Sequence, residues 1–409
     1  MYSSKEKFIE ALGVSTMPEL FGARFEETMR EYEEKGVFFL EESYIDSLQD
    51  KYNLFPEKYD FVKKSAKRVR ENDLLARYSL LLEHMLRDKN DNELISLTDI
   101  PGSDEEPLRT DYEMAAYFAE LAFAEDIAEY YRLHNVPKDV ICSTLSDCYE
   151  CCILVCQDCF GRDGFEIARC FAWNQLFINY KMLRVGIFNF EMRCNFTRDI
   201  SVYQNQEKDY CILVSGDIAF DGQLVGTVGH DTVEYCLNNV ENETEYIGYL
   251  ADTYNAIATP ELVYLNKNEW KKVLSFEDSV INVHIPSAVS FSYENMEASY
   301  SRCARIVKEC FPSFKPKAFA CFSWLMDPQL RNMLKPESNI LKFQSKYMRF
   351  PQITQGKAVH TFLFKKPVDK IEDWGEDTSL QRKVKQHYLN GNYIYEPGGV
   401  FFQHIENID

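Results

Sequence analysis

The sequence lacks several features that would assign it to a common class of protein. No window approaches the run of about 18 apolar residues that a membrane-spanning helix needs, and the opening residues, MYSSKEKFIEALG, have no apolar core of a secretory signal. There is also no glycine-rich dinucleotide fingerprint, Walker loop, HExxH or GxSxG motif. We therefore expect a soluble, cytoplasmic protein, and the enzyme classes that those motifs announce receive no support.

Positive charge is scarce. The chain has 45 Lys and Arg against 65 Asp and Glu, a formal net charge of −20. Nucleic acids and anionic membranes both require a basic face, so neither is expected as a partner. An acidic chain accommodates a cationic substrate such as an amine, whereas a site for the anionic cofactor CoA would need a basic patch of its own.

Cysteine, by contrast, is plentiful: the chain has thirteen, an odd number. Without an export signal, reduced thiols are the simplest interpretation. Cys148-x2-Cys151 and Cys156-x2-Cys159 have the spacing of a zinc site. However, Cys148, Cys152, Cys156 and Cys159 also recur on one face of a continuous helix, and the ILV between the two pairs supplies no tight turn. We therefore expect these cysteines to pack in a core and to bind no metal.

The hydrophobic pattern divides the chain in two. At 409 residues, two domains are the natural expectation. Residues 1–180 have helical periodicity. In FNFEMRCNF, from Phe188, the period changes from 3.6 to 2, as in a half-buried strand of an antiparallel sheet. The prediction is an α+β protein: an all-α N-terminal domain over residues 1–180 and a mixed α/β domain over residues 181–409.

One stretch of the second domain has a clear order of elements. SVINVHIP (Ser279 to Pro286) predicts a strand with Asn282 and His284 together on its polar face. Ser292 is a good cap for the helix that follows, and Ala318 begins a second strand. A loop that leads from a strand into a helix N-terminus is a ready site for an anion such as a pyrophosphate.

Four motifs in this order resemble a family of bacterial "acyltransferase domain-containing" proteins: LRVGIFNFE (183–191), HIP (284–286), SWLMDPQL (323–330) and SNILKFQ (338–344). The resemblance covers roughly residues 110–350. That family pairs a helical N-terminal domain with a domain similar to the GNAT acyltransferase superfamily. The resemblance therefore implies a GNAT-like fold and an N-acyltransferase that uses acetyl-CoA or another acyl-CoA. The acceptor would be a small amine or an amino sugar-like molecule.

The resemblance also implies where the cofactor would bind. We expect Ser287, Ser292 and Asn295, around the helix N-terminus, and Asn339 to contact it. Asn339 could alternatively hold a substrate amide or stabilise a loop, and the loop role is favoured over the substrate amide. GNAT enzymes usually carry Gln or Arg, two residues, Gly, any residue, then Gly or Ala in this loop. The corresponding SAVSFSYENMEAS (287–299) has no glycine. A non-catalytic binding module with a GNAT-like fold therefore stays open as the alternative.

Catalytic candidates follow from the chemistry. Acyl transfer to an amine needs a base for the amine and an acid for the departing thiolate. His284, at the end of the central strand, is the candidate base; alternatively it fixes the turn at Pro286. Ser323 and Tyr347 are candidate acids, with local capping and core packing as their alternatives. We expect Asp327 to be an N-cap, and a cleft where the strands ending at His284 and Ser323 separate.

Outside this stretch the patterns are weaker. Residues 205–275 are mixed, with a hairpin predicted over 210–226. AVHTFLFKKP (358–367) predicts a strand, SLQRKVKQHYLNG (379–391) a helix, and NYIYEPGGVFFQH (392–404) a closing hairpin.

Overall fold

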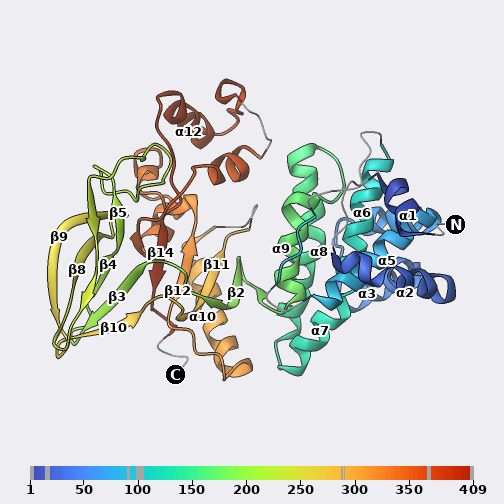
Figure 1. Cartoon of the computed structure of the whole chain (residues 1–409), viewed down its shortest axis with the longest axis horizontal. Coiled ribbons are helices and arrows are strands. Elements are labelled where there is room, and N and C mark those ends of the chain that lie inside the picture. Colours follow the sequence, from blue (N-terminus) through green and yellow to red (C-terminus); the bar gives the residue numbers. More distant parts are fainter. Residues whose placement is uncertain are drawn as a thin grey trace. The chain divides into compact units, whose positions relative to one another are not determined.

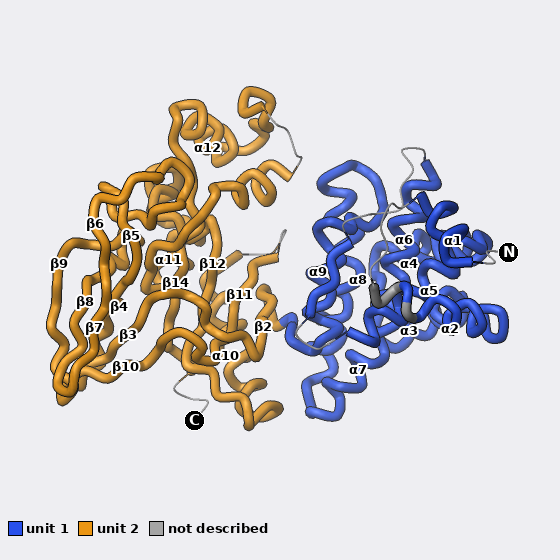
Figure 2. Tube along the Cα trace, viewed as in Figure 1, with its two compact units in different colours: residues 1–184 blue, residues 185–409 orange. Residues whose placement is uncertain are grey.

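A computed structural model describes residues 4–13, 19–89, 93–97, 106–286, 289, 291–365 and 370–405. The chain forms two compact units, residues 1–184 and residues 185–409, which Figure 2 colours separately. The predicted fold class is confirmed: a helical region is followed by a mixed α/β domain. In the described parts of both units, no helix is long and apolar enough to cross a bilayer.

Helices make up the first unit (Figure 1). Their bounds are α1 Lys5–Leu12, α2 Glu19–Lys35, η1 Phe38–Leu40, α3 Glu42–Tyr52, α4 Tyr59–Glu71, α5 Asp73–Asp88, α6 Leu108–Leu121, α7 Ala124–Leu133, α8 Lys138–Phe160 and α9 Ile167–Ile178. Local chemistry sets several ends. The Asn72 side chain accepts hydrogen bonds from the first amides of α5, and Gly161 ends α8 with a left-handed backbone at φ 70°.

Helix α8 contains the cysteine-rich segment. It is continuous from Lys138 to Phe160, as the spacing predicted, and its side chains at 148, 152, 156 and 159 are buried. All thirteen cysteines of the chain lie in the described residues, and no disulfide joins any of them. Across those residues no group of His, Cys, Asp and Glu side chains is arranged to hold a metal ion. The expectation that purified protein contains no zinc stays a prediction.

The second unit is built on a six-stranded sheet with the order β1-β2-β11-β12-β14-β13. Its strands are β1 Met182–Val185, β2 Phe188–Asn195, β11 Ser279–His284, β12 Phe319–Phe322, β13 Met348–Phe350 and β14 Gly398–Phe401. The pair β11–β12 is parallel, whereas β11 pairs with β2, and β12 with β14, in antiparallel fashion. The helix that connects β11 to β12 is α10, Tyr293–Cys310.

Helix α10 covers one face of this sheet, as its periodicity predicted. Ser292 caps it, because the serine side chain accepts a hydrogen bond from the Asn295 N–H at 3.2 Å. Tyr300 lies at the centre of its buried face, with ring centroids of Phe319 and Phe401 at 5.2 and 4.8 Å. Aromatic pairs of this kind contribute about 0.5–1.5 kcal/mol each beyond the area that they bury.

A second, antiparallel sheet lies in the chain between β2 and β11 and packs on the other face (Figure 1). Its strands are β3 Ile200–Asn205, β4 Tyr210–Val214, β7 Val240–Glu241, β8 Glu245–Asp252, β9 Ile257–Asn266 and β10 Trp270–Leu274; β5 Gly216–Ile218 pairs with β6 Tyr235–Leu237 separately. Val202, Ile212 and Val214 of this sheet share one core with Ala320 and Val400 of the first sheet.

The remaining elements come after β12: η2 Trp324–Met326, η3 Pro328–Asn332, α11 Asn339–Gln344, η4 His360–Phe364, η5 Ile371–Asp373 and α12 Ser379–Leu389. Helix α12 was predicted, and Thr378 caps it. The strand predicted over 358–367 is wrong, because residues 358–364 are helical and η4 is a π-turn there. The closing hairpin is also wrong: β14 alone forms, inserted between β12 and β13.

Candidate functional site

The two parallel strands of the central sheet stop pairing before they end. The β11–β12 ladder contains Ile281↔Phe319 and Asn282↔Ala320. Beyond it, His284 pairs with β2, while Phe322 pairs with β14. Past the ladder, β11 therefore stays paired with β2 and β12 stays paired with β14, while β11 and β12 no longer pair with each other. Strand ends that separate in this way are where a ligand reaches the middle of an open sheet. The cleft predicted there stays a prediction.

His284 forms a dyad with a carboxylate at this point. Its Nε2 lies 2.8 Å from Oε2 of Glu191 on β2. The amide of Asn282 donates to the same carboxylate oxygen at 3.1 Å and lies 3.3 Å from the imidazole Nε2. The side chains of His284 and Glu191 are 28% and 15% exposed, so solvent still reaches the ring. A carboxylate that accepts from imidazole fixes the orientation of the ring and stabilises its protonated form.

The two acid candidates lie elsewhere. Ser323 caps η2, with its hydroxyl oxygen accepting from the Leu325 N–H at 3.2 Å. The Tyr347 hydroxyl lies 2.6 Å from that of Tyr300, and burial raises the pKa of both phenols well above the ordinary value. Strand alternation puts Cys321, which is near this tyrosine pair, on the α10 face, opposite to the face of His284.

The N-terminus of α10 is partly occupied by its own side chains. The Asn295 N–H already donates to the Ser292 hydroxyl oxygen. Hydrogen bonds from its own backbone N–H and from the Ser292 hydroxyl lower the pKa of the exposed Glu294 carboxyl. An anionic ligand at this helix end would therefore have to displace a carboxylate. Ser287, the other cofactor candidate in this loop, lies outside the described residues.

Asn339 is exposed at the first position of α11. The cap of that helix is Ser338, whose hydroxyl oxygen accepts from the Ile340 N–H at 3.3 Å. Ser338, and not Asn339, therefore caps this helix, and the proposed contact of Asn339 with cofactor stays a prediction.

Sequence reasoning missed Glu191, the partner of His284. The signal was present, because Glu191 belongs to the polar half of the alternating strand β2 and Asn282 shares the polar face of β11. A single sequence does not give the strand register that places Glu191 opposite Asn282. Two polar side chains on one strand face need hydrogen-bond partners, but the sequence does not say which residue supplies them.

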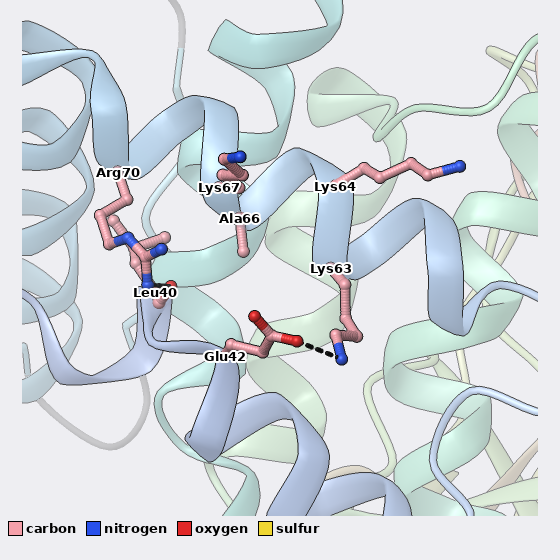
Figure 3. A pocket seen from close by; sticks show the side chains of 7 residues that line it. All are labelled: Leu40, Glu42, Lys63, Lys64, Ala66, Lys67 and Arg70. Atoms are coloured by element: carbon pink, nitrogen blue, oxygen red, sulfur yellow. Dashed lines mark hydrogen bonds and ion pairs between the residues drawn. The ribbon is translucent and has the colours of Figure 1, made fainter.

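The helical unit contains a separate surface depression of about 180 Å³ (Figure 3). Lys63, Lys64, Lys67 and Arg70 of α4 line it together with Leu40, Glu42 and Ala66. Three of these four cations have a counter-charge: Lys63 is 2.5 Å from Glu42, Arg70 is 2.8 Å from Glu41, and Lys67 is 3.8 Å from Glu71. The local charge is therefore largely balanced, and nothing there provides catalytic chemistry.

Comparison with known proteins agrees with this architecture. Residues 182–401 match the model of the family described as "GNAT-like C-terminal domain", which is more than half of the chain. The chain belongs to this GNAT-like family, as the motifs predicted. No curated protein matches the sequence.

Solved structures extend the similarity to the helical unit. A crystal structure of an acyltransferase in complex with CoA and 10C-teicoplanin is 14% identical with a TM-score of 0.63, and the match covers 97% of this chain and 98% of that one. An acyltransferase in complex with decanoyl-CoA matches with the same identity and coverage and a TM-score of 0.62. At this identity the similarity establishes the fold.

Proposed function

We propose that this protein transfers an acyl group from an acyl-CoA to the amine of an acceptor. The observation that carries the proposal is the dyad of His284 and Glu191, at 2.8 Å, where β11 and β12 stop pairing. Similarity in fold to an acyltransferase solved with decanoyl-CoA supports it.

In this proposal His284 takes the proton from the acceptor amine as the amine attacks the thioester carbonyl. An imidazole titrates near neutral pH and so suits this role. The Glu191 carboxylate is a positioning residue that holds the ring and offsets the positive charge that the ring gains. Asn282 donates to the same carboxylate oxygen and limits its rotation.

The two faces of the sheet have different roles in the proposed reaction. The amine approaches from the face of His284, and the thiolate leaves toward the α10 face. Ser323 or Tyr347 would supply its proton. Ser323 is the more accessible of the two, because Tyr347 is only 5% exposed and is bonded to Tyr300.

Binding of the acyl-CoA tests the proposal. We expect decanoyl-CoA at about a hundred times its Kd to stabilise the protein by about 2.7 kcal/mol, because a ligand that binds only the folded state stabilises it by mass action. Thermal unfolding with CoA, acetyl-CoA, octanoyl-CoA and decanoyl-CoA measures this effect and the preferred chain length. Release of free thiol with a panel of amines then measures transfer. If no acyl-CoA protects the protein, the alternative of a non-catalytic binding module replaces the enzyme.

Removing the charge of Glu294 should strengthen acyl-CoA binding. The amides at a helix N-terminus favour an anion, and the Glu294 carboxylate competes with the pyrophosphate for that position. We expect Glu294→Gln to lower the Kd of decanoyl-CoA about two- to tenfold, measured by calorimetry. Glu309→Gln, the same change at the other end of α10, is the control and should leave the Kd unaltered. Equal values for all three proteins would place the pyrophosphate away from this helix end.

A further inference from the structure

Arg198 lies in the segment through which the chain leaves the central sheet for the second one. Its guanidinium stacks on the ring of Phe322 with 4.3 Å to the ring centroid. The Nε–H donates to the side-chain oxygen of Gln352 at 2.7 Å, and Nη1 donates to the hydroxyl and carbonyl oxygens of Thr197 at 2.8 and 3.2 Å. Three contacts therefore hold the guanidinium in a defined orientation at the end of β12.

No counter-charge pairs with this arginine in the part of the chain that the structure describes. Among the described residues no ion pair joins Arg198 to a carboxylate, and burial lowers the pKa of its guanidinium. Arg349 also has no carboxylate partner at ion-pair distance, but it is 5% exposed and its donors reach the carbonyls of Met326 and Tyr254, so it has a structural role. A half-buried charge without a partner is costly unless a ligand supplies one.

Arg198 and the dyad belong to the same face of the central sheet. Asn282 pairs with Ala320, and side chains alternate along a strand, so His284 and Phe322 point to one face from neighbouring strands. Glu191, opposite Asn282, shares that face. The guanidinium on the Phe322 ring therefore lies on the same side as the His284 ring, at the carboxyl end of both strands.

We propose that Arg198 binds a carboxylate of the acyl acceptor and so directs the acceptor amine toward His284. This inference rests on the proposed transfer of an acyl group to an amine, and it names the acceptor class: amines that also carry a carboxylate, such as amino acids or peptides. Nε and Nη1 already donate within the chain, so Nη2 is the nitrogen left to make a charge-assisted hydrogen bond to a carboxylate oxygen. A dianionic phosphate fits less well, because the exposed Asp199 follows directly.

The test compares matched acceptors. With decanoyl-CoA as donor, free thiol release is measured for amino acids and for the corresponding amino acid amides, which keep the amine and lose the carboxylate charge. We expect the wild type to favour the carboxylate form. Arg198→Gln should reduce that preference about ten- to a hundredfold through KM, with protection by decanoyl-CoA unchanged. Arg198→Lys should keep part of the preference for the carboxylate form. The control is Arg305→Gln on the exposed side of α10, which should keep the full preference for the carboxylate form.

Three outcomes would overturn this role. The wild type could treat both forms alike, Arg198→Gln could slow both equally, or Arg198→Gln could weaken decanoyl-CoA binding itself, which would assign the arginine to a cofactor phosphate. If no amine is acylated, the proposed function fails separately. Calorimetric binding of the same acceptor pairs without acyl-CoA then still decides whether Arg198 recognises a carboxylate.

Discussion

Replacing His284 with alanine is expected to lower turnover by about 10²- to 10⁴-fold, because a positioned general base contributes about this much to the rate. Binding of decanoyl-CoA should change little, since the imidazole is proposed to act on the acceptor amine and the cofactor is proposed to bind at α10. Thiol release under saturating decanoyl-CoA measures the first quantity, and calorimetry measures the second.

Glu191→Gln is the matched variant for this experiment. It keeps the shape of the partner at 2.8 Å and removes its charge. If Glu191 acts through His284, this change should lower turnover less than His284→Ala does. It should also lower turnover little further when it is added to His284→Ala, because both changes then disable the same dyad. If His284→Ala leaves turnover intact, or if the variant fails to fold, the histidine is structural and the proposed base is wrong.

Replacing Asp327 with alanine should cost about 3 kcal/mol of stability at neutral pH, the largest effect expected outside the site. Asp327 was predicted to be an N-cap, and it caps η3 by accepting from the Gln329 N–H at 2.8 Å. Its other oxygen accepts from the Tyr395 N–H, and the residue is 0% exposed. Removal leaves buried donors unsatisfied at about 1–3 kcal/mol each. Urea unfolding measures the change.

The cost of this substitution should also depend on pH. Burial raises the pKa of Asp327 from 3.8 to about 6. The folded protein therefore holds this proton more tightly than the unfolded chain, and the contribution of Asp327 to stability falls as pH rises from about 4 to 6. Relative to Asp327→Ala, the wild type should lose about 3 kcal/mol across that window. Asp231→Ala, at an exposed aspartate, should show no such dependence. A difference that grows in the opposite direction would mean that Asp327 is stabilised as a carboxylate.

Much of the central sheet and of helix α10 could be predicted, because the sequence patterns that specify them are local. Alternation in β2 and β11, the Ser292 cap and the period of α10 depend only on neighbouring residues. By contrast, VHTFLF is as apolar as a strand, yet it is helical because His360 and Phe364 pack on Trp374, with centroid distances of 4.9 and 4.7 Å. Propensity does not report such a tertiary contact.

Some residues of the candidate site could likewise be found from local sequence, whereas others depend on contacts between distant segments. His284 was found from its own strand, whereas Glu191 required the register between β2 and β11, and Arg198 required the packing of a connection on Phe322. Ser323 and Tyr347 were chosen as hydroxyl groups that could act as acids, and Asn339 was chosen from the resemblance. The structure puts the first in a local cap, the second in a tyrosine pair and the third on the surface.

The position of the second sheet has a consequence for how the protein folds. Strands β2 and β11 are neighbours that together hold Glu191 and His284, yet residues 196–278 separate them in the chain. Closing a disordered loop of that length costs about 4 kcal/mol of chain entropy. Prior collapse of the second sheet brings the two ends together and removes most of this cost. Substitutions that weaken the second sheet should therefore slow refolding of the central sheet, although they lie far from the dyad in sequence.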